Sequence, residues 1–461
     1  MHQMCVALTN LDQAGVFMIC DRSLHRQGLP GVFSAGLLLS AYFALLTSAP
    51  RAPAQTFKII HEFPWPDGSA QPAGGTVPGG LTLGPRGELY GVAQNGGEVP
   101  ITGKAYCPQG CGIVYELSPV GTEWQFAVLH SFKNAPDGAF PYAPMILGTD
   151  GSLYGTTIGG GFHSDKCPSS YCGGTVFKLQ PCSFHPCRSA ETVLYRFPGG
   201  SAGEGPGFEA PVTFDDEGNI YGTTEGGGFF GGSCSSNTYG CGVVFELAPS
   251  AGDWRESVLY AFGDNAIGIN PTAGVVFDKQ GNLYGTTMAS DVYQLSPSAS
   301  GWNYNVLLTT PDEIQAGVIL DNAGDIFGVA ETGGQFDGGS AFEISAGGQI
   351  SDICNFPDYG DSYLPGPAAS LVMDAAGNLY GTTNQDGAYG LGTVFRLSPN
   401  GDSGTYTYTD LHDFSGPDGY SPLAPLVLDK HGNIFGTTYG GGPMLDATTY
   451  SFGVVFEITA N

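Results

Sequence analysis

The sequence predicts an all-β protein, a seven-bladed β-propeller built from four-stranded blades. Three observations support this prediction. A phrase of Gly, any residue, Leu or Ile, an aromatic and Gly occurs seven times, with its aromatic at Tyr90, Tyr154, Tyr221, Tyr284, Phe327, Tyr380 and Phe435. These aromatics recur every ~43 to 67 residues, which is room for four strands and their loops. The 461 residues include 74 Gly and 32 Pro, the poorest helix formers, so long helices are not expected.

The first element is a predicted leader. Residues 31–46 carry no charge, Arg22 and Arg26 precede them, and Ala52-Pro53-Ala54 follows as a small-residue cleavage motif. This order is that of a secretory signal peptide, so we predict residues 1–54 as the leader and residues 55–461 as one propeller domain. An uncleaved anchor is the alternative, because the uncharged stretch extends to Pro50 and approaches the ~20 residues that span a bilayer. We expect a secreted, periplasmic or cell-surface monomer with no membrane span in its mature chain.

The second unit shows the expected strands most clearly. Strand A covers 144–148, strand B 152–157, strand C 174–179 and strand D 191–197. In most units an Asp precedes the turn Gly between strands A and B. Because Gly allows positive φ and Asp bonds the turn backbone, this pattern predicts a tight A–B hairpin.

The two ends of the chain predict how the ring closes. The seventh unit supplies strand A (425–429), strand B (433–438) and strand C (453–458). Its fourth strand is expected from residues 57–63, which match the D strands ending at Phe132 and Phe414. This strand would complete the last blade and cover an exposed edge. An open β-solenoid is the alternative architecture.

The repeating unit also indicates a family. It reads PDG, then GN-L/I-Y-GTT, a Gly-rich loop and VF, and it resembles the bacterial GloVer repeat of exported choice-of-anchor tandem-repeat proteins. The resemblance covers about residues 57–461 of the chain. It implies export and repetition, but no particular activity.

The cysteines support the expectation of export. Eight of the eleven form four close pairs in Gly-, Pro- or Ser-rich loops. We predict a disulfide in each pair: Cys107 with Cys111, Cys167 with Cys172, Cys182 with Cys187, and Cys234 with Cys241. Zinc is the competing interpretation, because Cys-x3-Cys is near zinc spacing, but no second pair or His recurs in register to complete four ligands. We therefore predict no metal site, and we expect Cys354 to be a buried thiol.

We expect function on the face where the D–A and B–C connections emerge, because these are long and variable while the A–B turns are short. Candidate binding residues there are Asp67, Asp137, Glu204, Asp358 and Asp418 of the D–A connections, with His163 and Asp165 of a B–C loop. The alternative is that Pro-Asp-Gly is a turn motif in which Asp caps the backbone. Ca²⁺ is the cation such carboxylates would take, but no single loop supplies the six to eight oxygens it needs, so no cofactor is predicted.

Other polar residues recur around the ring, and we predict structural roles for them. Thr-Thr pairs follow the signature Gly in five units, where they are expected to bond the backbone of neighbouring blades. His61, His130 and His412 share one position in strand D, which Tyr or Cys occupies in other units. This interchange indicates packing between blades.

The formal net charge of −28 excludes nucleic acid and anionic lipid as partners. The favoured hypothesis is an exported binding module that recognises an extracellular polysaccharide or a cell-envelope protein. The alternative is a polysaccharide lyase or glycoside hydrolase that uses carboxylates near the pore mouth. No catalytic residue can be assigned, because every polar motif repeats.

Overall fold

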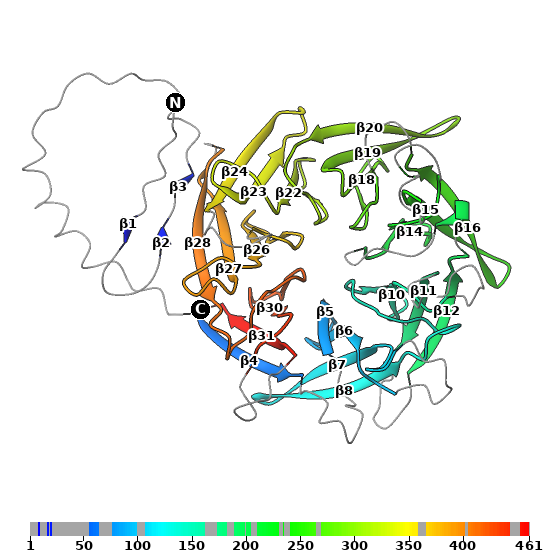
Figure 1. Ribbon diagram of the computed structural model, residues 1–461, viewed down its shortest axis with the longest axis horizontal. Coiled ribbons are helices and arrows are strands. Elements are labelled where there is room, and N and C mark those ends of the chain that lie inside the picture. Colours follow the sequence, from blue (N-terminus) through cyan, green and yellow to red (C-terminus); the bar gives the residue numbers. More distant parts are fainter. Residues whose placement is uncertain are drawn as a thin grey trace, which may run out of the picture.

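The computed structural model forms a closed ring of seven antiparallel sheets, each with four propeller strands, arranged around a central axis (Figure 1). It describes residues 55–63, 76–98, 107–161, 173–181, 189–198, 200–203, 210–229, 234, 240–263, 269–357, 366–401, 404–442 and 452–460, with three two-residue strands near the N-terminus. The predicted seven-bladed propeller is therefore confirmed. The predicted leader lies almost wholly outside the described residues.

Each blade places strand A innermost and strand D outermost. The A strands are β5 (Thr76–Leu83), β9 (Ile146–Leu147), β13 (Thr213–Phe214), β17 (Val276–Phe277), β21 (Ile319–Leu320), β25 (Val372–Met373) and β29 (Val427–Leu428). The B strands are β6 (Leu89–Asn95), β10 (Leu153–Thr157), β14 (Ile220–Thr224), β18 (Leu283–Thr286), β22 (Ile326–Ala330), β26 (Leu379–Thr383) and β30 (Ile434–Thr437).

The C strands are β7 (Ile113–Val120), β11 (Thr175–Gln180), β15 (Val243–Ser250), β19 (Asp291–Ser298), β23 (Asp337–Ile344), β27 (Thr393–Pro399) and β31 (Val454–Thr459). The D strands are β8 (Glu123–Ser131), β12 (Ala190–Arg196), β16 (Asp253–Ala261), β20 (Gly301–Thr309), β24 (Ile350–Pro357), β28 (Tyr406–Asp413) and β4 (Thr56–Glu62). Outside the blades lie β1 (Leu8–Thr9), β2 (Val16–Phe17), β3 (Ile19–Cys20) and the 3-10 turn Gly200–Ala202. Among the described residues, no helix is long and apolar enough to cross a bilayer.

The A–B hairpin is built by the Asp that the sequence places before the turn glycine. In blade 4, Asp278 Oδ1 accepts hydrogen bonds from the amides of Gln280 and Asn282, and Oδ2 accepts from Asn282 Nδ2 and Tyr284 Oη. Gly281 within this turn has φ 83°, which favours glycine. The Tyr in this hydrogen-bond network is the aromatic of the signature phrase. The repeated sequence therefore contains the residues that form the hydrogen bonds of the turn.

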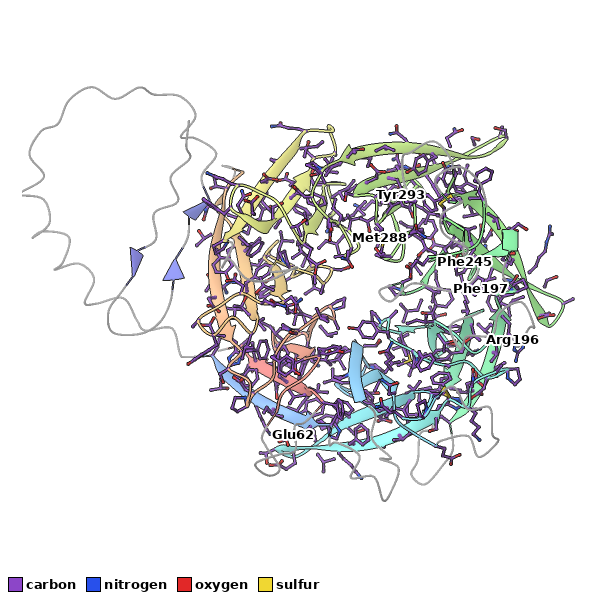
Figure 2. All side chains as sticks on the ribbon, viewed as in Figure 1. Glu62, Arg196, Phe197, Phe245, Met288 and Tyr293 are labelled. Carbon is purple, nitrogen blue, oxygen red and sulfur yellow. A yellow bond between two sulfur atoms is a disulfide. The ribbon has the colours of Figure 1, made fainter. Side chains whose placement is uncertain are left out.

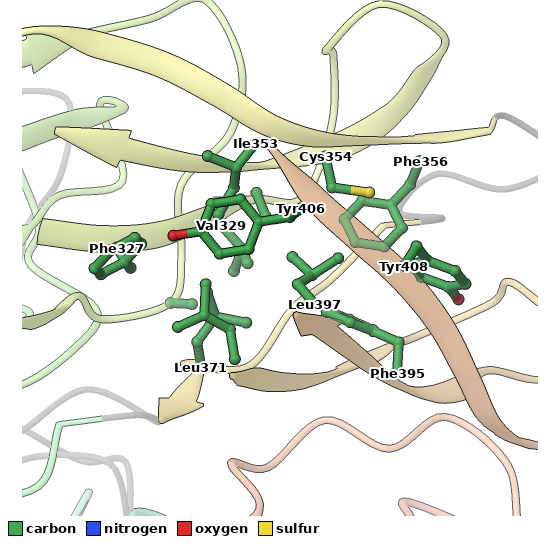
Figure 3. Packing of buried hydrophobic residues seen from close by; sticks show 13 residues of the cluster. Phe327, Val329, Ile353, Cys354, Phe356, Leu371, Phe395, Leu397, Tyr406 and Tyr408 are labelled. Atoms are coloured by element: carbon green, nitrogen blue, oxygen red, sulfur yellow. The ribbon is translucent and has the colours of Figure 1, made fainter. Parts of the chain in front are cut away.

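The last glycine of the phrase is fixed by packing instead. A Cβ on Gly155 would lie 2.7 Å from Phe177 Cζ, because the aromatic ring of strand C covers the glycine of strand B. Phe177 in turn packs edge-on against Phe132 of the preceding blade. Seven hydrophobic clusters follow this plan, one at each joint between neighbouring blades. Figure 3 shows the cluster between blades 5 and 6, where Cys354 is buried as a thiol.

The Thr-Thr pairs join the blades as predicted. The first Thr of each pair donates to a backbone carbonyl of the next blade, which lies before strand A in four blades and within β5 in the first: Thr156 to Ala210, Thr223 to Ala273, Thr286 to Ala316, Thr382 to Pro422 and Thr437 to Gly79. These carbonyls bond across the joint. The two A strands predicted at 144–148 and 425–429 are too long, since ladder pairing covers only 146–147 and 427–428.

Strand β4 closes the ring. It pairs antiparallel with β31, with Val455 opposite His61 and Ile458 opposite Phe57, so the blue and red ends of the propeller lie side by side (Figure 1). Thr437 of the last blade then bonds Gly79 of the first. The closing strand runs from 56 to 62, close to the predicted 57–63, and the open solenoid is excluded.

Candidate functional site

The loop-rich face departs from the repeat most strongly in its B–C connections. Residues 96–112, 158–174 and 225–242 link strands B and C in blades 1 to 3, and residues 438–453 do so in blade 7. Blade 4 uses only residues 287–290, and blade 5 only 331–336. The loop-rich face is therefore low at blades 4 and 5, and its long B–C connections belong to blades 1, 2, 3 and 7.

Two of the four predicted disulfides lie among the described residues, and both are present. Cys107–Cys111 and Cys234–Cys241 bring their Cα atoms to 5.1 and 5.5 Å, and all four residues are buried. The carbonyl of Cys111 accepts the amide of Phe140, and that of Cys241 accepts the amide of Asn270. Each disulfide therefore fixes the base of a B–C loop against the following D–A connection.

The other two predicted disulfides fall in stretches that the structure does not describe. Cys167 and Cys172 lie within residues 162–172, in the B–C connection of blade 2. Cys182 and Cys187 lie within residues 182–188, between strands C and D of the same blade. Neither the Cys167 to Cys172 bond nor the Cys182 to Cys187 bond is therefore among the disulfides found, and both stay predictions.

Of the predicted binding residues, the structure describes Asp137 and Asp418. Asp137 Oδ2 accepts the amide of Lys133, and Asp418 Oδ1 accepts the amide of Ser415, so both carboxylates cap their turns. Asp418 Oδ2 also lies 3.0 Å from His412 Nε2. Because His412 belongs to an outermost strand, this carboxylate lies away from the pore mouth. Asp67, Glu204, Asp358, His163 and Asp165 lie outside the described residues, and ligand binding by all seven stays a prediction.

The shared His position of strand D forms one half of a stacked aromatic contact at three of the joints. His61 stacks on Phe126 of the next blade with ring centroids 4.1 Å apart, and His412 stacks on Phe57 at 3.8 Å. The Tyr260–Tyr304 contact is equivalent at 4.4 Å. Packing between blades, predicted from the interchange of His with Tyr and Cys, is confirmed for these joints.

The joint between blades 1 and 2 differs, because Glu191 replaces the stacking aromatic. His130 Nε2, Asp137 Oδ2 and a carboxylate oxygen of Glu191 all lie within 4.8 Å of one another, and the His130–Asp137 distance is 3.3 Å. His130 Nε2 and Glu191 Oε1 are buried and make no hydrogen bond within the described part of the chain. Burial, together with the negative charge of Asp137, raises the pKa of Glu191 to about 7. We call these three residues the joint cluster.

Sequence reasoning identified Asp137 as a candidate and His130 as a packing residue, but it missed Glu191. An alignment of the D strands would have shown Glu191. Six residues before the last Phe of the D strand, blades 7 and 1 carry Phe57 and Phe126, whereas blade 2 carries Glu191. Blade 3 also carries a carboxylate there, Glu256, but it faces Tyr195 rather than a His, so the combination of Glu191 with His130 is what sets this joint apart.

The opposite face holds a cavity of about 650 Å³, lined by the A–B turns of blades 3 to 5. Of its four aspartates, Asp215, Asp278 and Asp321 accept hydrogen bonds from the backbone of their own turns. Burial alone would raise the pKa of Asp278, but hydrogen bonds from Asn282 and Tyr284 outweigh this effect and hold the pKa below its ordinary value. The same account applies to Asp215. This cavity therefore offers turn-bound carboxylates rather than reactive ones.

Exposed apolar side chains gather in the B–C connections of the loop-rich face. Four of the exposed large hydrophobic residues described lie there: Phe229, Met288, Tyr389 and Tyr439. Met288 and Tyr439 occupy equivalent positions, each directly after its Thr-Thr pair. Figure 2 shows Met288 on the inner side of the ring and Arg196 on its outer edge. Exposed apolar side chains therefore occur in the B–C connections of four different blades of the loop-rich face.

Solved structures similar to this chain have low sequence identity to it. A protein of unknown function from Dyadobacter fermentans is 12% identical, covering 87% of this chain and 99% of its own, with a TM-score of 0.42. A protein from Bacteroides fragilis with the provisional name 6-phosphogluconolactonase is 14% identical, covering 76% of this chain and 88% of its own, with a TM-score of 0.48. These likenesses concern the fold alone. No curated protein matches the chain significantly.

The family is established independently by its repeat. The description of the matching family is the Gloeobacter/Verrucomicrobia repeat, and its matches span residues 51–289, 166–364 and 289–461. Together these matches cover every blade. The chain therefore belongs to the Gloeobacter/Verrucomicrobia repeat family.

Proposed function

We propose that this protein is an exported propeller that binds an extracellular polysaccharide or a cell-envelope protein through its loop-rich face. The observation that carries the proposal is the set of exposed apolar side chains in the B–C connections. Tyr389 and Tyr439 present rings that can stack on a sugar or fill a pocket of a protein partner. Phe229 and Met288 are further exposed apolar side chains in B–C connections of the same face.

Two further features support binding. The buried disulfides fix loop bases in blades 1 and 3, which lowers the entropy that those loops lose when a partner orders them. The formal charge of −28 favours neutral or basic partners over anionic ones. The repeated Asp and Thr side chains are occupied by turn and inter-blade bonds, so binding falls to residues that do not repeat.

A matched pair of variants tests the proposal. Tyr389→Ala combined with Tyr439→Ala removes two exposed rings from the loop-rich face. Val128→Thr combined with Val258→Thr alters two exposed apolar residues on outer strands instead. We expect the first variant to lose binding on a neutral-glycan array or in a pull-down from envelope extract, by at least about tenfold per lost anchor. The second variant should bind like the wild type.

The outcomes separate the hypotheses. Binding of the wild type to a glycan on the array assigns a polysaccharide ligand. Binding of the wild type only in the pull-down assigns a protein partner. Equal binding by wild type and the variant lacking Tyr389 and Tyr439 would overturn the assignment to this face. Release of shortened sugar chains during incubation would replace the binding module by the lyase or hydrolase alternative.

A further inference from the structure

The joint cluster is unusual because its ligand-type atoms meet without satisfying one another. His130 comes from β8, Asp137 from the connection that leaves β8, and Glu191 from β12 of the next blade. Buried polar atoms normally find a hydrogen-bond partner, yet His130 Nε2 and Glu191 Oε1 have none among the described residues. Something that accepts lone pairs from both an imidazole and carboxylates would complete the cluster.

We propose that His130, Asp137 and Glu191 form a binding site for a first-row divalent transition ion, with Zn²⁺ preferred, that links blades 1 and 2.

The spacing of the ligand atoms fits such an ion. Metal–ligand distances of about 2.0–2.2 Å place neighbouring ligand atoms of a tetrahedral zinc about 3.4 Å apart. The His130 Nε2–Asp137 Oδ2 distance is 3.3 Å, and the carboxylate of Glu191 lies within 4.8 Å of both. A small rotation of the Glu191 side chain would therefore complete three ligands. Asp137 Oδ2 also accepts the Lys133 amide, which orients the carboxylate as it binds.

The ligand set selects the class of ion. One imidazole nitrogen with carboxylate oxygens suits zinc and neighbouring transition ions. Calcium needs six to eight oxygens, and magnesium prefers octahedral oxygen ligation, so neither matches this set. Three protein ligands leave a fourth position of a tetrahedral zinc for water or a polar group of a bound partner.

The position of the cluster explains what the ion would do for the ring. Val92 stands where five blades carry the Thr that bonds the next blade, and Glu191 stands where Phe57, Phe126 and Tyr304 stack at other joints. The joint between blades 1 and 2 thus lacks two of the devices that recur elsewhere. A bound ion would tie β8 to β12 across this joint and stabilise the folded state by mass action.

The joint between blades 6 and 7 supplies a built-in control. His412 and Asp418 repeat the His–Asp pair at 3.0 Å, but Phe57 occupies the place of Glu191 and stacks on the imidazole. This joint therefore offers two ligands and no third. The proposal predicts an ion at one joint and none at the other.

The test uses the full, tag-free, oxidised protein after removal of metal with a chelator. Titration with ZnCl₂ by calorimetry should give one site, and Glu191→Gln should weaken that site by about 100-fold or more. His412→Gln should leave stoichiometry and affinity unchanged. Cobalt replaces zinc as a spectroscopic probe, and the intense visible absorption of low-coordinate Co²⁺ should appear in the wild type and disappear in Glu191→Gln.

Other results would overturn the proposal. Absence of zinc binding by the folded wild type would do so. So would equal affinity in the wild type and Glu191→Gln, or loss of the site in His412→Gln. Circular dichroism of each variant confirms the fold, and none of these outcomes depends on the ligand of the loop-rich face.

Discussion

Glu331 provides a direct test of how burial controls the stability of this ring. The residue follows β22 on the loop-rich face, its side chain is 3% exposed, and its Oε2 makes no hydrogen bond within the described residues. Its amide donates to the carbonyl of Glu313, 2.7 Å away. Burial first, and then the charge of Glu313, raises the pKa of Glu331 from 4.5 to about 7. The folded state therefore holds this proton more tightly than the unfolded chain does.

The sign and size of the effect follow from proton linkage. Between pH 4.5 and 7 the folded state binds more protons at this group, so stability decreases as pH rises through that window. Each pKa unit corresponds to about 1.36 kcal/mol, so Glu331 costs the folded state about 3 kcal/mol at pH 8 relative to pH 4. Glu331→Gln removes this titration and keeps the shape. We expect the variant to gain stability over the wild type progressively with pH, reaching about 3 kcal/mol at pH 8.

Urea unfolding of both proteins at pH 4, 5, 6, 7 and 8 measures the difference. Glu123→Gln, at the exposed first residue of β8, is the matched control and should follow the wild-type curve. A stability difference between Glu331→Gln and wild type that stays constant from pH 4 to pH 8 would show that the carboxyl does not titrate as argued.

Three further predictions concern the architecture. A chain that starts at Gly68 lacks β4 and exposes the edge of β31, so it should elute as oligomers in size-exclusion chromatography, whereas a chain that starts at Gln55 should be monomeric; equal elution would contradict ring closure. Thr437→Val leaves the buried carbonyl of Gly79 without its partner and should cost about 1–3 kcal/mol in urea unfolding, while Thr122→Val in an exposed turn should be neutral. Reduction of the two described disulfides should cost less than the ~3 kcal/mol of a fifteen-residue loop, so far-UV circular dichroism should be retained. A cooperative loss of β structure on reduction would show that the disulfides hold the core.

The elements that sequence predicted well are those whose chemistry is local. The Asp278 turn, its positive-φ glycine and its Tyr284 bond all lie within seven consecutive residues, so one repeat displays the complete motif. The two described disulfides likewise close within short loops. The predicted A strands were too long, since ladder pairing covers only 146–147 and 427–428. The bonds between blades were not predicted in detail either: the carbonyl of Ala210, for example, accepts a hydrogen bond from Thr156 of the preceding blade. That partner lies in another repeat, and no local pattern shows it.

The joint cluster was not predicted from the sequence for the same reason. The next joint along the ring, between blades 2 and 3, shows which residues determine the chemistry of a joint. Glu256 occupies the equivalent position in blade 3, but there it faces Tyr195, whose hydroxyl donates to the carboxylate at 3.3 Å. Glu191 faces His130, and Asp137 adds a second carboxylate. The same residue type therefore gives a Tyr–Glu hydrogen bond at one joint and three converging metal ligands at the next. In a ring of repeated blades, a chemical site is defined by the pair of residues that meet across a joint, so it becomes visible only when neighbouring repeats are compared in register.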